Sequence, residues 1–112
     1  MPASDLPLGE FELVVLLAIL RLHDDAYGLS IRREIAACTD RAPSPGAVYT
    51  TLDRLQEKGL TASKYQNAGQ GRGGRQKRLF RVTAKGLAAV GRAQRSSQRL
   101  FHGLVLPGGA HA

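Results

Sequence analysis

The chain has 112 residues, enough for one domain, and a formal net charge of +7. Cys38 is its only cysteine, which excludes a disulfide framework and a cysteine-based metal cluster. The longest apolar run, Leu13 to Leu20, is too short to span a bilayer, and no basic segment precedes an apolar one as it would in a secretory signal. We therefore expect a protein of the reducing cytoplasm that makes no membrane contact.

The two halves of the chain carry opposite charges. Residues 1–57 hold all nine acidic residues and five basic ones, a net charge of −4, whereas residues 58–112 hold eleven Lys and Arg and no Asp or Glu, a net charge of +11. Surface charges are usually interspersed. An acid-free half therefore indicates attraction to a polyanion, either nucleic-acid phosphates or lipid headgroups. General solubility is the alternative explanation.

The first predicted helix follows an extended arm of residues 1–8 and begins near Gly9. Its core-facing stripe has helical i, i+3, i+4 spacing and consists of Phe11, Val14, Val15, Ala18, Ile19 and Leu22. Much of the remaining circumference is filled by Leu13, Leu16, Leu17 and Leu20. A helix that is apolar almost all round needs two partners, so we expect one face to enter the core and the other to bind a second copy of the chain.

Two shorter helices are predicted after a break at residues 23–27. The first of them should cover residues 28–38, and the second residues 44–58. Ser44 and Pro45 supply an N-cap hydroxyl and a proline at the first helical position, and Gly59 is the glycine that commonly follows a helix end. The buried face of this third helix is predicted to consist of Val48, Leu52 and Leu55.

A hairpin with a basic loop is predicted next. Residues 60–65 and 77–82 have strand character, and the second segment alternates charged with apolar side chains. Between them, residues 67–75 are polar and rich in glycine and arginine. Such a loop can follow a phosphate backbone or enter a minor groove, and it also resembles an RGG segment of RNA-binding proteins.

A final helix should begin after the N-cap Thr83 and end near His102 or Leu104. Its apolar residues form a heptad-like seam with a polar middle. We expect residues 84–105 to be a dimerisation helix and residues 106–112 to be a flexible tail. The predicted dimer interface joins this seam to the first helix and consists of Leu13, Leu17, Leu20, Leu87, Val90, Phe101 and Leu104.

This order of elements predicts an α+β, mostly α fold. Residues 9–83 would form a winged helix-turn-helix, with three helices and a two-stranded wing, followed by the added C-terminal helix. The segments AYGLSIRREI, SPGAVY, LDRLQEKGL and RLFRVTAKG, in this order, resemble the PadR family of transcriptional regulators over roughly residues 8–90. The single helix after the wing resembles the short form of that family. Binding of a small-molecule effector stays an open alternative, but the sequence shows no dedicated pocket for one.

The resemblance and the charge distribution together imply a sequence-specific DNA-binding transcriptional regulator, a repressor that acts as a homodimer on an inverted repeat of double-stranded DNA. The third helix should enter the major groove, where threonine and arginine can contact base edges, with the wing on the flanking backbone. The expected DNA-binding residues are Ser44, Gly46, Ala47, Tyr49, Thr50, Thr51, Arg54, Lys64, Arg72, Arg75 and Lys77. Asp53 and Glu57 should point away from the phosphates, toward the second helix or a partner.

Candidates for other chemistry are weak. Because the sequence shows no paired carboxylates, nucleophile motif or metal-ligand spacing, we expect no enzyme activity, cofactor or metal. Cys38 is expected to be a small buried side chain rather than a redox switch. Two further functions stay open. The capped third helix argues against a basic RNA-associated protein that uses the RGG-like loop, and the acid-free half argues against a purely structural dimerisation module.

Overall fold

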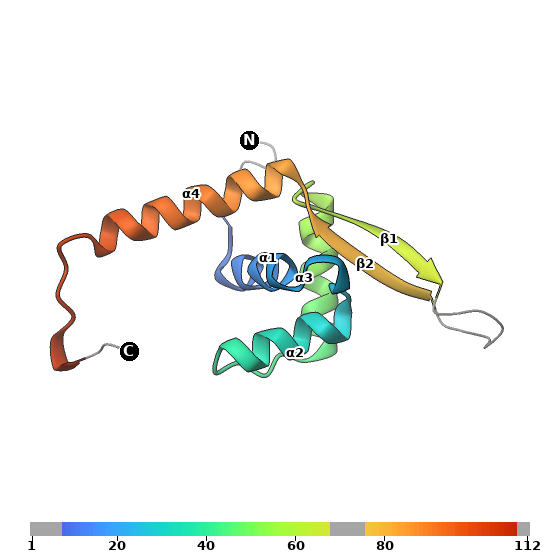
Figure 1. Ribbon diagram of the computed structural model, residues 1–112, viewed down its shortest axis with the longest axis horizontal. Coiled ribbons are helices and arrows are strands. Elements are labelled where there is room, and N and C mark those ends of the chain that lie inside the picture. The colour runs from blue at the N-terminus through green and yellow to red at the C-terminus, as the bar shows by residue number, and fades with distance from the viewer. Residues whose placement is uncertain (1–7, 68–75, 110–112) are drawn as a thin grey trace.

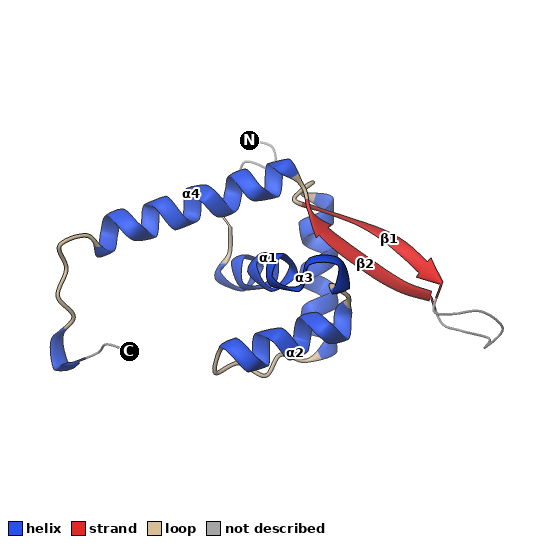
Figure 2. Cartoon of the chain, viewed as in Figure 1, coloured by secondary structure: helices blue, strands red, loops and turns tan. Residues whose placement is uncertain are grey.

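The computed structural model describes residues 8–67 and 76–109. The chain is mostly helical with one two-stranded antiparallel sheet, as Figures 1 and 2 show. The elements, in chain order, are α1 (Glu10–Leu22), a 3-10 turn (His23–Asp25), α2 (Gly28–Cys38), α3 (Pro45–Glu57), β1 (Thr61–Asn67), β2 (Gln76–Val82), α4 (Ala84–Phe101) and a second 3-10 turn (Pro107–Gly109). This is the predicted order, and the second turn lies in the segment expected to be a flexible tail.

The core lies between α1, α2 and α3, and β2 closes one side of it. Its largest fully buried side chains are Leu16, Ile19, Ile31, Ile35, Leu52, Leu55, Val15 and Val48. Burial of each such side chain stabilises the fold by roughly 1.5–3 kcal/mol before chain entropy is counted. The expected stripe of α1 is only partly right, because Leu16, which we expected outside the stripe, is fully buried.

The helix ends follow the local signals in the sequence. The Ser44 hydroxyl accepts a hydrogen bond from Ala47 N at 3.1 Å, and Pro45 is the first residue of α3. Gly59, just beyond α3, has a φ of +76°, in the left-handed region where glycine pays no Cβ penalty. The Thr83 hydroxyl accepts from Gly86 N at 3.1 Å and caps α4.

The hairpin is joined to the body through main-chain hydrogen bonds. Phe80 N of β2 donates to Ala26 O at 2.8 Å, and Leu60 N, just before β1, donates to Leu55 O of α3 at 3.0 Å. Leu60 was predicted to begin the first strand. It is instead a buried residue between α3 and β1, and β1 runs from Thr61 to Asn67. The strands pair from Thr61 opposite Val82 to Asn67 opposite Gln76.

The last helix leaves the body of the molecule. Figure 1 shows α4 with its first turns beside the hairpin and its second half extending past α1. The helix ends at Phe101, and Gly103 follows with a φ of +75°. The predicted end at His102 or Leu104 was therefore slightly late, and Leu104 does not continue the helical seam.

Candidate nucleic-acid interface

The first half of α3 presents a strip of small side chains to solvent. Gly46, Ala47 and Thr50 are exposed, and a Cβ added at Gly46 would meet no atom within 4 Å. Arg54 is exposed one turn after Thr50. Because the opposite face of α3 is buried, this strip is the one that α3 can offer to a partner. Small residues let the helix backbone approach a groove closely, and threonine and arginine can bond to base edges.

Thr51 is a correction to the predicted interface. We expected it to face outward, but it is only 5% exposed. At 3.6 residues per turn, Thr51 lies close to the stripe defined by Val48 and Leu55, so its side chain packs inside the domain. Burial removes Thr51 from the set of residues that can contact DNA, whereas Thr50 beside it stays available.

Tyr49 reaches the beginning of α2. A Cβ added at Gly28 would lie 2.4 Å from Tyr49 Oη and 2.6 Å from Tyr49 Cζ, so the tyrosine ring lies against the first turn of α2. From β2, Lys77 Nζ lies 4.4 Å from the centre of the Tyr27 ring, a cation–π contact. Tyr49 thus contacts Gly28, the first residue of α2, and Lys77 contacts Tyr27, its N-cap. A positive helix end with a hydroxyl and an ammonium group nearby favours an anion.

The turn before α3 is held by α2. Arg32 Nε donates to Pro43 O at 3.2 Å, two residues before the first residue of α3. Together with the Ser44 cap, this bond fixes where α3 begins. Ser44 therefore has an observed structural role, because its hydroxyl oxygen accepts a hydrogen bond from Ala47 N. Its role as a DNA contact stays a prediction.

Arg78 joins the hairpin to α3. Its guanidinium donates to Ser63 Oγ at 3.0 Å, to Gln56 Oε1 at 3.1 Å and to Asp53 Oδ1 at 3.4 Å. The Ser63 hydroxyl also donates to Gln56 Oε1 at 2.7 Å. The Asp53 carboxylate thus contacts β2, whereas we expected it to point toward α2 or a partner. The sequence indicated a basic strand at Arg78 but not this bridge, which fixes the wing to the flank of the exposed helix.

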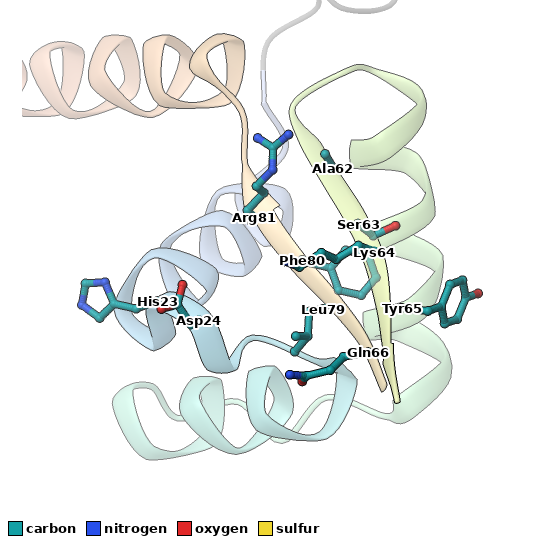
Figure 3. Close-up of a pocket in the computed structure, with 10 residues that line it drawn as sticks. All are labelled: His23, Asp24, Ala62, Ser63, Lys64, Tyr65, Gln66, Leu79, Phe80 and Arg81. Atoms are coloured by element: carbon teal, nitrogen blue, oxygen red, sulfur yellow. The ribbon is translucent and has the colours of Figure 1, made fainter. Parts of the chain in front are cut away.

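The outer face of the hairpin carries Lys64. Figure 3 shows an open hollow between the turn at His23 and Asp24 and this face of the sheet, with a volume of about 490 Å³. Lys64 and Arg81 lie on it, whereas residues of the other face, such as Ser63, are turned toward α3. The predicted wing-tip contacts Arg72 and Arg75, and the RGG-like loop that contains them, lie outside the described residues.

A nearly buried ion pair fixes the other end of α3. Lys58 Nζ donates to Glu12 Oε2 at 2.8 Å and to Oε1 at 3.0 Å, and the two side chains are 13% and 7% exposed. Burial raises the pKa of the Glu12 carboxyl, but the hydrogen bonds from Lys58 and from Gly9 N outweigh it, and the net pKa is lowered. The sequence places Lys58 at the end of the predicted third helix but gives no signal that Glu12 pairs with it.

Apolar side chains of α1 and α4 remain at the surface. Among the predicted dimer residues, Leu17, Leu87, Phe101 and Leu104 are exposed, Leu13 and Leu20 are partly exposed, and Val90 packs against the core. The predicted seam missed Leu100, which is 79% exposed beside Phe101. The seam was defined by alternating steps of three and four residues, and these steps do not include position 100. The exposed side chain of Leu100 can nevertheless contact a partner.

Cys38 is another correction. We expected a buried side chain, but Cys38 is exposed, with its thiol 3.4 Å from Glu34 Oε2. Glu34 accepts from Arg21 Nε at 2.6 Å, and this bond lowers the pKa of the Glu34 carboxyl. Within the described ranges no three His, Cys, Asp or Glu side chains are grouped to hold a metal ion. No helix there is both long and apolar enough to cross a membrane.

Three packed helices, a hairpin fixed to the third of them and an exposed strip on that helix define a winged helix-turn-helix protein, a class that inserts its exposed helix into DNA. The profile of the Transcriptional regulator PadR-like family matches residues 16–92. The chain belongs to this family, which confirms the predicted fold class and family. This family consists of transcriptional regulators.

Individual relatives agree with this assignment. Transcriptional regulator YqjI of Escherichia coli K12 is 38% identical over 64 residues, which are 55% of this chain and 30% of YqjI. The chain thus matches less than a third of that relative's length. A PadR family regulator from Clostridium difficile R20291 is 25% identical with a TM-score of 0.63, covering 81% of this chain and 90% of its own. One from Eggerthella lenta DSM 2243 shares the fold, at 24% identity and a TM-score of 0.64, covering 81% and 79%.

Proposed function

We propose that this chain is a transcriptional repressor that binds an inverted-repeat operator as a homodimer, in the cytoplasm at the nucleoid. The observation that carries the proposal is the exposed strip of α3, Gly46, Ala47, Thr50 and Arg54, on a helix fixed at both ends. A fixed helix loses little freedom on binding, and its side chains meet base edges in one register. Tyr49 and Lys77 would hold a phosphate beside it.

The dimer part of the proposal rests on the apolar surface of α1 and α4. A soluble monomer rarely exposes a large contiguous apolar patch, and a two-fold interface between these helices would cover it on both copies. Two α3 helices would then be held at a fixed separation, as an inverted repeat requires. A dimer spanning a promoter would exclude other proteins from that stretch of DNA, which is the basis for proposing repression.

The test is a binding comparison on DNA selected by the protein itself. Duplexes enriched from a random library by the unmodified chain serve as the operator, and a scrambled duplex of equal length serves as the reference. Arg54→Ala should lose about 1–3 kcal/mol of operator preference if it contacts a base. Arg33→Ala, at an exposed arginine on α2, is the matched control and should retain that preference. Equal losses on both duplexes for Arg54→Ala would contradict the assignment of α3.

A further inference from the structure

The outward side of α4 carries a row of cations. Gly86 and Ala89 are buried against the body. Lys85, Arg92 and Arg99 repeat every seven residues along an exposed flank of the helix, and Arg95 lies beside them, opposite the buried residues. We call these four residues the distal basic stripe. All four are exposed, and the apolar side chains Leu87 and Phe101 lie on other faces of the same helix.

Among the residues that the structure describes, no acidic side chain pairs with this stripe. The ion pairs found within residues 8–67 and 76–109 use Arg21, Arg41, Lys58 and Arg78, none of them from α4. The sequence has no Asp or Glu after Glu57. Like charges three and four residues apart, as in Arg92, Arg95 and Arg99, destabilise a helix slightly. The stripe therefore costs free energy in the isolated chain and would be stabilised by a polyanion.

The stripe lies at the opposite end of the domain from the exposed strip of α3. The Thr83 hydroxyl, which caps α4, donates to Gly59 O at 2.7 Å, so α4 begins where α3 ends. Ala47 and Thr50 are in the first half of α3, and Figure 1 shows α4 extending from the far end of that helix. The four cations of the stripe are thus not explained by binding of the first duplex along α3.

We propose that the distal basic stripe is a second DNA-binding surface, with which a molecule already bound to one duplex captures another. Between the cations lie Ala88, Gly91 and Gln98, so this face has no large apolar side chain to insert into a lipid bilayer. The cations from Arg92 to Arg99 follow a line about 10 Å long on the helix. Duplex DNA carries one negative charge per about 1.7 Å of its axis, so several phosphates can lie within reach of this line. The side chains of Arg95, Gln98, Arg99 and His102 line a shallow, open depression on this face.

The stripe uses neither α3 nor the proposed dimer interface, so its failure would leave the proposed function standing. The experiment loads the full chain onto an immobilised random-sequence duplex, removes unbound protein, and adds a second, labelled random-sequence duplex at about 50 mM salt. In the proposed dimer the α3 helix of the second copy could also capture DNA, so the stripe is reported by the difference in capture between variants that change only the stripe. Arg92, Arg95 and Arg99 are changed together to Gln, and a matched variant changes the same three to Lys.

We expect the unmodified chain and the Lys variant to capture the second duplex. The Gln variant should still load onto the immobilised duplex through α3, and capture per loaded molecule should fall roughly tenfold or more because three phosphate contacts are lost. Equal thermal unfolding of the three proteins checks that the fold is retained. Absence of capture by the unmodified chain, or equal capture by the Gln variant, would overturn the proposal. So would binding to vesicles of anionic lipid through these arginines without capture of a duplex.

Discussion

The ring of Tyr49 and the missing side chain of Gly28 occupy the same space. A Cβ at position 28 would lie 2.4 Å from the tyrosine hydroxyl, closer than any non-bonded contact allows. Tyr49 belongs to α3 and Gly28 begins α2. The glycine is therefore required by close approach of two helices, and it sets how far Tyr49 can lean over the first turn of α2.

Replacing Gly28 with Ala should destabilise the chain by about 1–3 kcal/mol, because overpacking forces the tyrosine ring or the helix to move. Truncating Tyr49 to Ala removes the obstacle. In urea unfolding, the double variant Gly28→Ala, Tyr49→Ala should therefore be destabilised by clearly less than the sum of the two single variants. Additive losses would show that the two residues do not share this space.

The ion pair of Glu12 and Lys58 should contribute most of the stability that is lost when residues at the C-terminal end of α3 are changed. Lys58→Met leaves a buried carboxylate without its partner and should cost about 3–5 kcal/mol of unfolding free energy. Adding Glu12→Gln removes the stranded charge, so the double variant should recover part of this loss. Urea unfolding of the four proteins at neutral pH gives the coupling, and a coupling near zero would contradict the pairing.

The same pair predicts a pH dependence. The pKa of Glu12 is lowered in the folded chain, so the unfolded chain binds a proton more readily and acid favours unfolding. The stabilisation is complete above the ordinary pKa of 4.5 and is lost as the pH falls through the lower, folded value. The difference in unfolding free energy between the unmodified chain and Glu12→Gln should be constant at neutral pH and shrink in acid. A difference that grows in acid would contradict this sign.

Neighbouring threonines of α3 should respond differently to the same substitution. Thr50→Val removes an exposed hydroxyl and should reduce preference for the selected operator by about 1–3 kcal/mol if a base contact is lost. Thr51→Val acts on a buried side chain and should change the unfolding free energy without changing that preference. Operator and scrambled-duplex affinities, measured beside urea unfolding, separate the two effects. A loss of preference for Thr51→Val would restore the original assignment of that residue.

The proposed dimer should depend on residues of both terminal helices. Leu17→Ser with Phe101→Ser removes exposed apolar side chains from α1 and α4 and should yield monomers. Val105→Ser, at an exposed apolar residue outside the proposed interface, is the matched control and should stay dimeric. Sedimentation equilibrium of the three proteins at micromolar concentration provides the comparison. A monomeric mass for the unmodified chain would remove the two-fold interface.

Much of the fold could be predicted because its signals are local. The cap at Ser44, the proline after it and the glycine at position 59 act within a few residues of each other, and α3 lies within one residue of the predicted span. The apolar periodicity likewise located α1 and α2. Thr51 was misplaced because a small polar side chain on the edge of an apolar stripe fits either side of the helix.

The candidate site was harder to predict where it depends on contacts between distant residues. The pairing of Glu12 with Lys58, the bridge from Arg78 to Asp53 and the overlap of Tyr49 with Gly28 join elements that only the tertiary fold brings together. The charge asymmetry was visible in the sequence as a single property of residues 58–112. In the structure, the basic side chains are divided between the wing and the distal basic stripe. The reason is that α4 starts beside the C-terminal end of α3, whereas the exposed strip lies in the first half of α3.

The most direct test of the account is a hydroxyl-radical footprint of the unmodified chain on a duplex that it has selected from a random library. If a homodimer places two α3 helices in successive major grooves, protection should appear as two equivalent patches on one face of the duplex. Their centres should lie about 10–10.5 base pairs apart, or twice that distance, and the protected sequences should form an inverted repeat. A single protected patch, or uniform protection without an inverted repeat, would contradict the dimeric mode of DNA recognition proposed for this protein.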